Sequence, residues 1–90
     1  ALEIEEVLLS HPDVNECAVV GLPDEEWGEV VCAALIGKEE QLKQETFKVW
    51  LKDYLPPYKI PKSFLYLDAL PRNAMGKVTK NELKKLFKNR

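Results

Sequence analysis

Short runs of apolar residues alternate with polar stretches along this chain, and the spacing within each run predicts a helix or a strand. The first apolar run has helical spacing and ends before His11-Pro12, because a proline disfavours helical conformation in the residue before it. Residues 14–20 and 29–36 are short, apolar and rich in β-branched side chains, which is typical of core strands. The sequence therefore begins with a predicted helix and two strands. The helical positions are Ala1, Ile4, Val7 and Leu8.

The segment between the two strands, residues 21–28, has glycines at both ends and a Pro-Asp pair inside, which predicts a turn. Residues 44–55 carry an apolar stripe at helical spacing that stops at two prolines, which predicts an amphipathic helix. Residues 62–67 alternate as a third strand. We expect the aromatic side chains of the middle helix to belong to the core. The stripe consists of Phe47, Trp50, Leu51, Tyr54 and Leu55.

A polar connection from Asp68 to Lys77 leads to a last helix, in which Thr79 and Glu82 have the spacing of a capping box. Its apolar face is formed by Leu83, Leu86 and Phe87. The order helix, strand, strand, helix, strand, helix predicts an α+β fold, a sheet of about three strands covered by helices. At 90 residues the chain has room for one domain, residues 1–90, with a modest core.

The net charge of −2 conceals a strong asymmetry between the two halves of the chain. Residues 1–45 contain twelve acidic and two basic residues, whereas residues 46–90 contain eleven basic and three acidic residues. A basic half predicts contact with an anion, and phosphate is the commonest biological one. The alternative for the lysines of the last helix is a solvated surface, and composition does not decide between the two.

Few side chains are available as ligands or nucleophiles, which narrows the possible chemistry. Cys17 and Cys32 lie in apolar runs, so we expect free thiols in the cytoplasm or another reducing compartment. One histidine and two cysteines without CxxC spacing do not build a zinc site, and we expect no bound metal. A Ser–His–Asp triad would need His11, for which we expect a structural role. No apolar run is long enough to span a membrane.

Residues 70–80, LPRNAMGKVTK, form the segment best suited to carry chemistry. Gly76 allows the backbone to approach a partner closely, and the flexible stem of Lys77 can place a charge in a site formed elsewhere. A nucleotide-binding phosphate loop would need a glycine and a hydroxyl where this chain has Pro71 and Val78. The spacing alone therefore predicts only a loop that contacts an anion.

Three segments resemble the small C-terminal domain of the acyl-adenylate-forming enzymes, which include acyl-CoA synthetases, luciferases and the adenylation domains of peptide synthetases. They are HPDVNECAVVGLPDEEWGE, YKIPK and LPRNAMGKVTKNELKK, and the likeness covers essentially the whole chain. Its most specific part is the P-x-x-x-x-G-K run from Pro71 to Lys77. Within the family, PRNAMGK looks similar to malonyl-CoA synthetases and fatty-acid CoA ligases. The resemblance implies a mobile lid domain that works with the N-terminal adenylation domain of the same protein.

The resemblance also implies an acyl-CoA synthetase that uses ATP, a carboxylic acid and CoA as substrates. A carboxylate attacks the α-phosphate of ATP to give an acyl-adenylate and pyrophosphate, and the CoA thiol then displaces AMP to give the thioester. The loop at Gly76 and Lys77 would serve the first half-reaction, with Lys77 as the catalytic lysine, and Mg²⁺ would bind with ATP outside this domain. After rotation, an opposite face of the domain would form part of the CoA tunnel. The residues implied there are Gly21, Leu22, Pro23, Lys52 and Lys59.

Two hypotheses from other classes stay open at this point. One is a nucleic-acid-binding domain that uses the basic last helix with tryptophan and tyrosine stacking, although a net charge of −2 is unlike the strongly basic modules of that kind. The other is a non-catalytic interaction module in which Lys77 is ordinary exposed surface. The acidic residues 24–26 lack a partner in the sequence pattern, and we expect them to be solvated.

Overall fold

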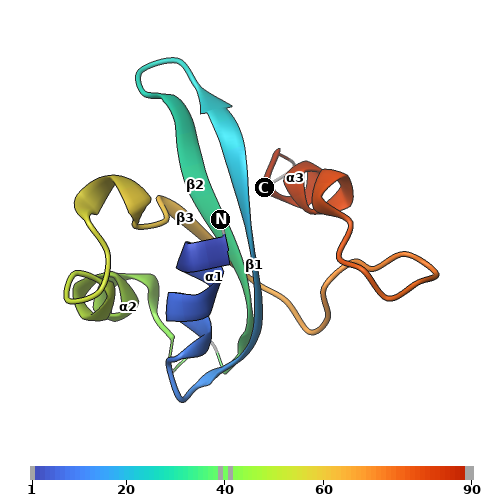
Figure 1. The fold of residues 1–90 in the computed structure, drawn as a ribbon, viewed down its shortest axis with the longest axis horizontal. Coiled ribbons are helices and arrows are strands. Elements are labelled where there is room, and N and C mark those ends of the chain that lie inside the picture. The colour runs from blue at the N-terminus through green and yellow to red at the C-terminus, as the bar shows by residue number, and fades with distance from the viewer. Residues whose placement is uncertain (1, 39, 41, 89–90) are drawn as a thin grey trace.

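The chain folds into a three-stranded sheet with helices on both faces (Figure 1). A computed structural model describes residues 2–38, 40 and 42–88. β1 and β2 are antiparallel, and β3 lies parallel to β2, in the order β1-β2-β3. The predicted α+β fold and its order of elements are confirmed, while Ala1 lies outside the described residues. The elements are α1 (Leu2–Leu9), β1 (Val14–Asp24), β2 (Gly28–Gly37), α2 (Gln44–Leu51), the 3₁₀ turn η2 (Pro57–Lys59), β3 (Ser63–Tyr66) and α3 (Lys80–Lys88).

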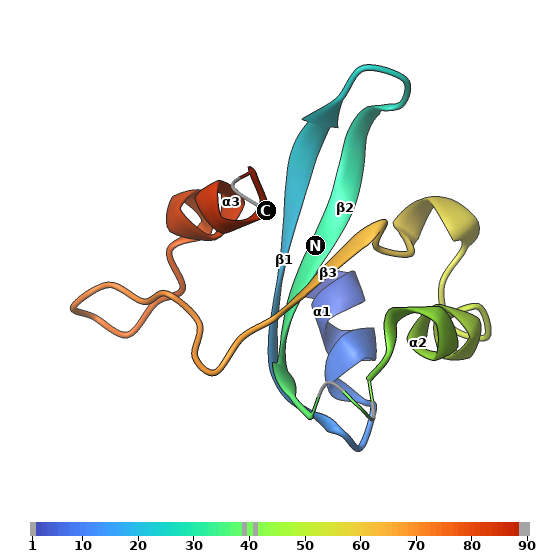
Figure 2. The ribbon, with the colours of Figure 1, turned by 180° about the vertical axis from the view of Figure 1, so that it is seen from behind.

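Both faces of the sheet are buried, because α1 and α2 cover one face and α3 covers the other (Figures 1 and 2). Successive strand residues point to opposite faces, so Val19 and Ala33 pack under α1 and α2, whereas Val20 and Ala34 pack under α3. A sheet covered on both faces needs continuous apolar strands rather than alternating ones. This explains the two unbroken apolar runs in the sequence.

A bulge near the start of β1 changes which face its residues occupy. Val14 pairs with Gly37 but Glu16 pairs with Ile36, so β1 advances two residues while β2 advances one. The extra residue places Val14 with the core under α1 and α2, and it leaves Glu16 on the α3 face. Without the bulge, Val14 and Glu16 would share one face.

At Val19, the outer edge of β1 is bonded by two side chains of opposite charge. The backbone N–H of Val19 donates a hydrogen bond to Glu5 Oε2 (2.8 Å), and the Lys80 ammonium donates to the Val19 carbonyl oxygen (2.7 Å). The same ammonium forms an ion pair with Glu5 Oε2 at 2.8 Å. These contacts join α1, β1 and the first residue of α3 at one point.

The predicted turn over residues 21–28 is wrong for most of its length. β1 continues to Asp24 and β2 begins at Gly28, so only three residues form the hairpin loop. Gly28 has φ of 82°, the left-handed conformation that a three-residue hairpin uses at its end. Pro23 fits in β1 because an edge strand has one side of its backbone free of the ladder.

The predicted helices differ from the observed ones mainly at their ends. α2 ends at Leu51, and the chain then forms a turn. Pro56 disfavours helical conformation in Leu55, so the helix does not extend to its predicted end at residue 55. Leu55 is nevertheless buried, whereas Tyr54 is 56% exposed and is not a core residue. In α3, Leu86 is exposed although the sequence pattern placed it in the apolar face.

Two glycines of the sheet should respond very differently to the same substitution. A Cβ on Gly37 would lie 2.4 Å from the Asp13 carbonyl oxygen and 2.7 Å from Leu42 Cδ1, whereas a Cβ on Gly21 would meet only the movable carboxylate of Glu29. We expect Gly37→Ala to lower the free energy of unfolding by about 1–3 kcal/mol, as overpacking does, and Gly21→Ala to lower it by less than about 1 kcal/mol. Urea unfolding of the two variants measures the difference, and equal losses would contradict it.

Candidate functional site

The loop that carries Lys77 projects sideways from the fold, between β3 and α3 (orange, at the right in Figure 1 and at the left in Figure 2). Its base is closed by an antiparallel bridge between Arg72 and Val78 and by a hydrogen bond from the Asn73 N–H to the Lys77 carbonyl oxygen (2.9 Å). Gly76 has φ of 83°, which a residue with a side chain rarely adopts, and its N–H donates to the Asn73 carbonyl oxygen (2.9 Å). The loop is therefore a tight turn with a defined backbone.

The side chain of Asn73 completes this turn. Its Oδ1 accepts hydrogen bonds from the N–H groups of Met75 (2.9 Å) and Lys77 (3.1 Å). An asparagine amide commonly replaces backbone contacts in this way in turns. The backbone of Lys77 is thus held at both its N–H and its carbonyl group, while Met75 is 84% exposed at the tip of the loop.

Lys77 itself is exposed, and its ammonium has no hydrogen-bond or ion-pair partner among the residues that the structure describes. An ammonium on a flexible stem above an ordered backbone can reach an anion that another surface presents. Two of the lysines of α3 differ in this respect, since Lys80 pairs with Glu5 and Lys85 with Glu82. The ammonium of Lys77 thus differs from those of Lys80 and Lys85, which are held by carboxylates.

The hairpin of β1 and β2 projects in a different direction, beyond the helices at the top of Figure 1. Gly21, Leu22 and Pro23 lie in the last part of β1, paired with residues 29–31 of β2. The structure does not bring these residues together with Lys77. They belong to a second candidate region at another end of the domain.

A hollow of about 310 Å³ opens beside this hairpin, and its polar and aromatic lining was missed from the sequence. Trp27 and Tyr58 are exposed aromatic residues on its rim, and the Lys62 ammonium lies 5.2 Å from the centre of the Trp27 ring. An aromatic residue in a hairpin loop, and another next to prolines, are the sequence signals that could have found it. The full lining is Trp27, Glu29, Val30, Val31, Pro57, Tyr58 and Lys62.

Lys52 and Lys59, the predicted CoA contacts, have different surroundings. Lys52 is exposed and caps the end of α2. The Lys59 ammonium lies 2.8 Å from Glu3 Oε2, and this hydrogen bond raises the pKa of Lys59 and lowers the pKa of Glu3. To bind a phosphate, Lys59 would have to break its ion pair with Glu3, whereas Lys52 is exposed to solvent and could bind one directly.

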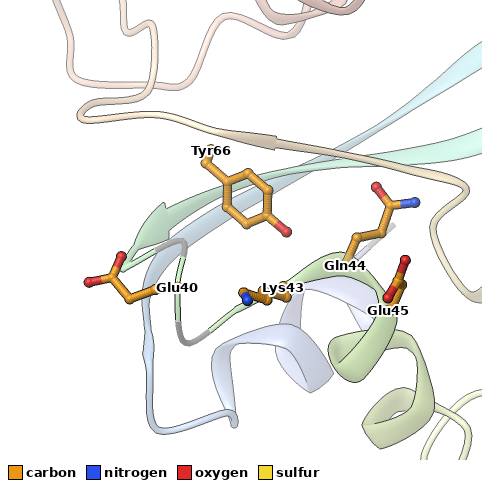
Figure 3. A pocket seen from close by; sticks show the side chains of 5 residues that line it. All are labelled: Glu40, Lys43, Gln44, Glu45 and Tyr66. Atoms are coloured by element: carbon orange, nitrogen blue, oxygen red, sulfur yellow. The ribbon is translucent and has the colours of Figure 1, made fainter.

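A second hollow, of about 420 Å³, lies between β3 and the start of α2 (Figure 3). Tyr66 points from β3 toward Lys43 and Gln44, and its hydroxyl donates a hydrogen bond to the Leu42 carbonyl oxygen (2.5 Å). Glu40 and Glu45 complete the lining, so acidic and basic groups are mixed there. Neither the predicted anion-binding loop nor the hairpin contributes to this hollow.

The cysteines and the acidic residues offer little further chemistry. Cys17 and Cys32 form no disulfide, and burial, followed by the nearby Glu5 charge, raises the pKa of Cys17 to about 12, so its thiol stays protonated. Within the described part of the chain no group of three or more His, Cys, Asp or Glu side chains could hold a metal ion. None of the described helices has the length and apolar character needed to cross a membrane.

Comparisons with known proteins show that this chain is similar to one part of several CoA ligases. A probable CoA ligase from Humulus lupulus is 49% identical over 94% of this chain and 16% of its own length, and a malonate–CoA ligase from Arabidopsis thaliana is 47% identical over 99% and 16%. Apo MatB from Rhodopseudomonas palustris is 36% identical with a TM-score of 0.88, over 97% of this chain and 18% of its own. The chain spans about a sixth of the length of the curated relatives it matches.

A fatty acyl CoA synthetase from Mycobacterium tuberculosis has the same fold, with a TM-score of 0.86 and 36% identity over 94% of this chain and 17% of its own. A family model described as the AMP-binding enzyme C-terminal domain matches residues 3–77, which include the hairpin and end at the loop lysine. The family model, the fold and the sequence identities all indicate the same family, and the chain belongs to the family of AMP-binding enzyme C-terminal domains.

Proposed function

We propose that this domain is the C-terminal lid of an ATP-dependent acid–thiol ligase, and that Lys77 acts in the formation of the acyl-adenylate. The observation that carries the proposal is the state of the Lys77 loop. The backbone of Lys77 is fixed by Asn73, while its ammonium is free of partners in the described part of the chain. The Lys77 ammonium is therefore available to bind an anion that another domain presents.

The chemistry of adenylation gives a cation at this place a clear role. The attacking carboxylate and the α-phosphate of ATP are both anions, and negative charge shifts among the phosphoryl oxygens during an in-line transfer. An ammonium between them weakens the repulsion and stabilises the transition state when water is excluded. Lys77 lines neither of the two hollows described above. The N-terminal domain of the same protein would therefore supply the pockets for ATP and for the acid.

The second half-reaction would use the hairpin. CoA carries an adenine ring and phosphates, and the hollow beside the hairpin offers the aromatic rings of Trp27 and Tyr58 with the ammonium of Lys62. The pantetheine would pass along the end of β1 at Gly21, Leu22 and Pro23. The Lys77 loop and the hairpin project from different ends of the domain, so each half-reaction needs its own pose against the N-terminal domain.

Trp27 and Lys62 should affect thioester formation selectively. We expect Trp27→Ala in the full-length enzyme to raise the KM for CoA about tenfold, because stacking on one aromatic ring contributes about 1–3 kcal/mol. Lys62→Ala should also raise this KM, because it removes the ammonium offered to the CoA phosphates. ATP–pyrophosphate exchange should stay close to the wild-type rate. The matched controls are Tyr54→Ala, an exposed tyrosine on the turn after α2, and Lys43→Ala, which lines the other hollow; neither should change either half-reaction.

Two results would contradict the proposal. One is an equal loss of both half-reactions in Trp27→Ala and Lys62→Ala without a change in melting temperature. The other is ATP–pyrophosphate exchange by the 90-residue chain alone, assayed with fatty and dicarboxylic acids, since we expect a lid without substrate pockets to be inactive.

A further inference from the structure

One guanidinium fastens the Lys77 loop to the sheet. Arg72 donates a hydrogen bond from Nη1 to the carbonyl oxygen of Gly76 (2.8 Å), the residue directly before Lys77. From Nη2 it donates to Glu16 Oε1 and forms an ion pair with this carboxylate of β1. Arginine suits this double contact because its donors lie in a rigid plane. A single side chain therefore joins the catalytic loop to a strand far away in the sequence.

The backbone pairing of Glu16 and of Arg72 sets the position of both residues. Glu16 directly follows the bulge of β1, pairs with Ile36 and so faces the α3 side of the sheet, where the loop begins. The backbone of Arg72 pairs with Val78 on the other side of the loop. The hydrogen bonds of Asn73 give the turn its internal shape, but only Arg72 connects the tip of the turn with β1 among the described contacts.

Gly76 lies at an open part of the loop. A Cβ built on it would find nothing within 4 Å, so no other part of the chain packs beside its Cα at that position. Its carbonyl group is held by Arg72 and its N–H by Asn73. A displacement of about 1 Å in a catalytic group can cost up to about a hundredfold in rate.

We propose that Arg72, held by Glu16, is a positioning residue for Lys77. The pair fixes the direction in which the loop leaves the sheet, and the Lys77 ammonium then reaches the same place each time the lid closes. The inference rests on the proposed function of Lys77 and adds two residues to it. Arg72 and Glu16 act through the loop and have no contact with substrate.

The inference is tested by measuring the rates of the two half-reactions separately in variants of the full-length enzyme. We expect Arg72→Ala to lower the kcat of acyl-adenylate formation about tenfold and Glu16→Ala about three- to tenfold, with little change in the KM for ATP. Glu16→Gln keeps an oxygen that accepts from the guanidinium and should restore most of the rate. The matched control is Glu82→Ala, which removes another exposed ion pair, that with Lys85, and should leave the rate unchanged. Conversion of pre-formed acyl-adenylate to the thioester should be unaffected in all four variants.

A double mutant separates positioning from other roles. If Arg72 acts through Lys77, Arg72→Ala should cause no further loss in a Lys77→Ala background, because residues that act as a unit are not additive. Multiplied losses in the double mutant would overturn the inference, as would wild-type kcat in Arg72→Ala or equal losses in both half-reactions. In each of these cases an inactive Lys77→Ala leaves the proposed function standing. Wild-type adenylation by Lys77→Ala would overturn the proposed function itself.

Discussion

Lys77→Ala should lower the rate of acyl-adenylate formation on the order of 10²–10³-fold in the full-length enzyme, the loss that follows removal of a dominant transition-state group. The substitution removes the ammonium and leaves the loop intact, because Asn73 bonds only the backbone of Lys77. ATP–pyrophosphate exchange measures this first half-reaction. The melting temperature should stay within about 2 °C of the wild-type value, as for other exposed surface positions.

The second half-reaction provides the internal control for Lys77→Ala. Conversion of pre-formed acyl-adenylate and CoA to the thioester should continue at close to the wild-type rate, since the proposed second pose turns the hairpin rather than the loop toward the substrates. Lys43→Ala removes a lysine from the opposite side of the sheet and should change neither step. A Lys77→Ala enzyme that forms acyl-adenylate normally would exclude the role proposed here for this lysine.

Phe64→Ala should remove the largest single contribution of one side chain to the stability of the domain. Phe64 is 1% exposed, comes from the short strand β3 and packs against Phe47 of α2 with 5.5 Å between ring centres. Truncating a buried phenylalanine costs about 3–5 kcal/mol, a large part of the total expected for a chain of this size. The melting temperature should fall by more than about 12 °C, because about 1 kcal/mol corresponds to about 4–8 °C in a small domain.

Tyr58→Ala is the matched control for this loss. It removes an aromatic ring of similar size from a side chain that is 76% exposed, and it should change the free energy of unfolding by no more than about 0.5 kcal/mol. Circular dichroism of the 90-residue chain during heating compares the two variants directly. Similar melting temperatures for Phe64→Ala and Tyr58→Ala would mean that the core under α2 contributes far less than its burial indicates.

Local patterns in the sequence predicted the centres of the elements well and their ends less well. The apolar runs located β1 and β2, since a sheet covered on both faces must be apolar at every position. The residues Gly21 to Asp24 are typical of a turn, but pairing with β2 extends the strand through them. Turn propensity is a local preference, and cross-strand hydrogen bonds override it when the partner strand is long enough.

Some residues of the candidate site could likewise be predicted from a local motif, whereas others are brought together only by the fold. Lys77 and Gly76 lie in one continuous motif, so their shared loop could be predicted from the sequence. Trp27 and Lys62 meet only because β3 returns parallel to β2 after a crossover through α2, which no local pattern specifies. The contact between Arg72 and Glu16 also depends on the bulge in β1, because a shift of one residue turns a side chain to the other face.

The bonding of the β1 edge at Val19 by Glu5 and Lys80 bears on the tendency of this domain to aggregate. An edge strand with unpaired backbone groups can recruit a strand from another chain, which leads to aggregation or domain swapping. At Val19, both backbone groups are already bonded to charged side chains, and an incoming strand would have to break an ion pair to replace them. If the domain acts as the proposed lid and separates from a larger domain during catalysis, this edge can thus meet a crowded solution without offering unpaired backbone groups at Val19 to another chain.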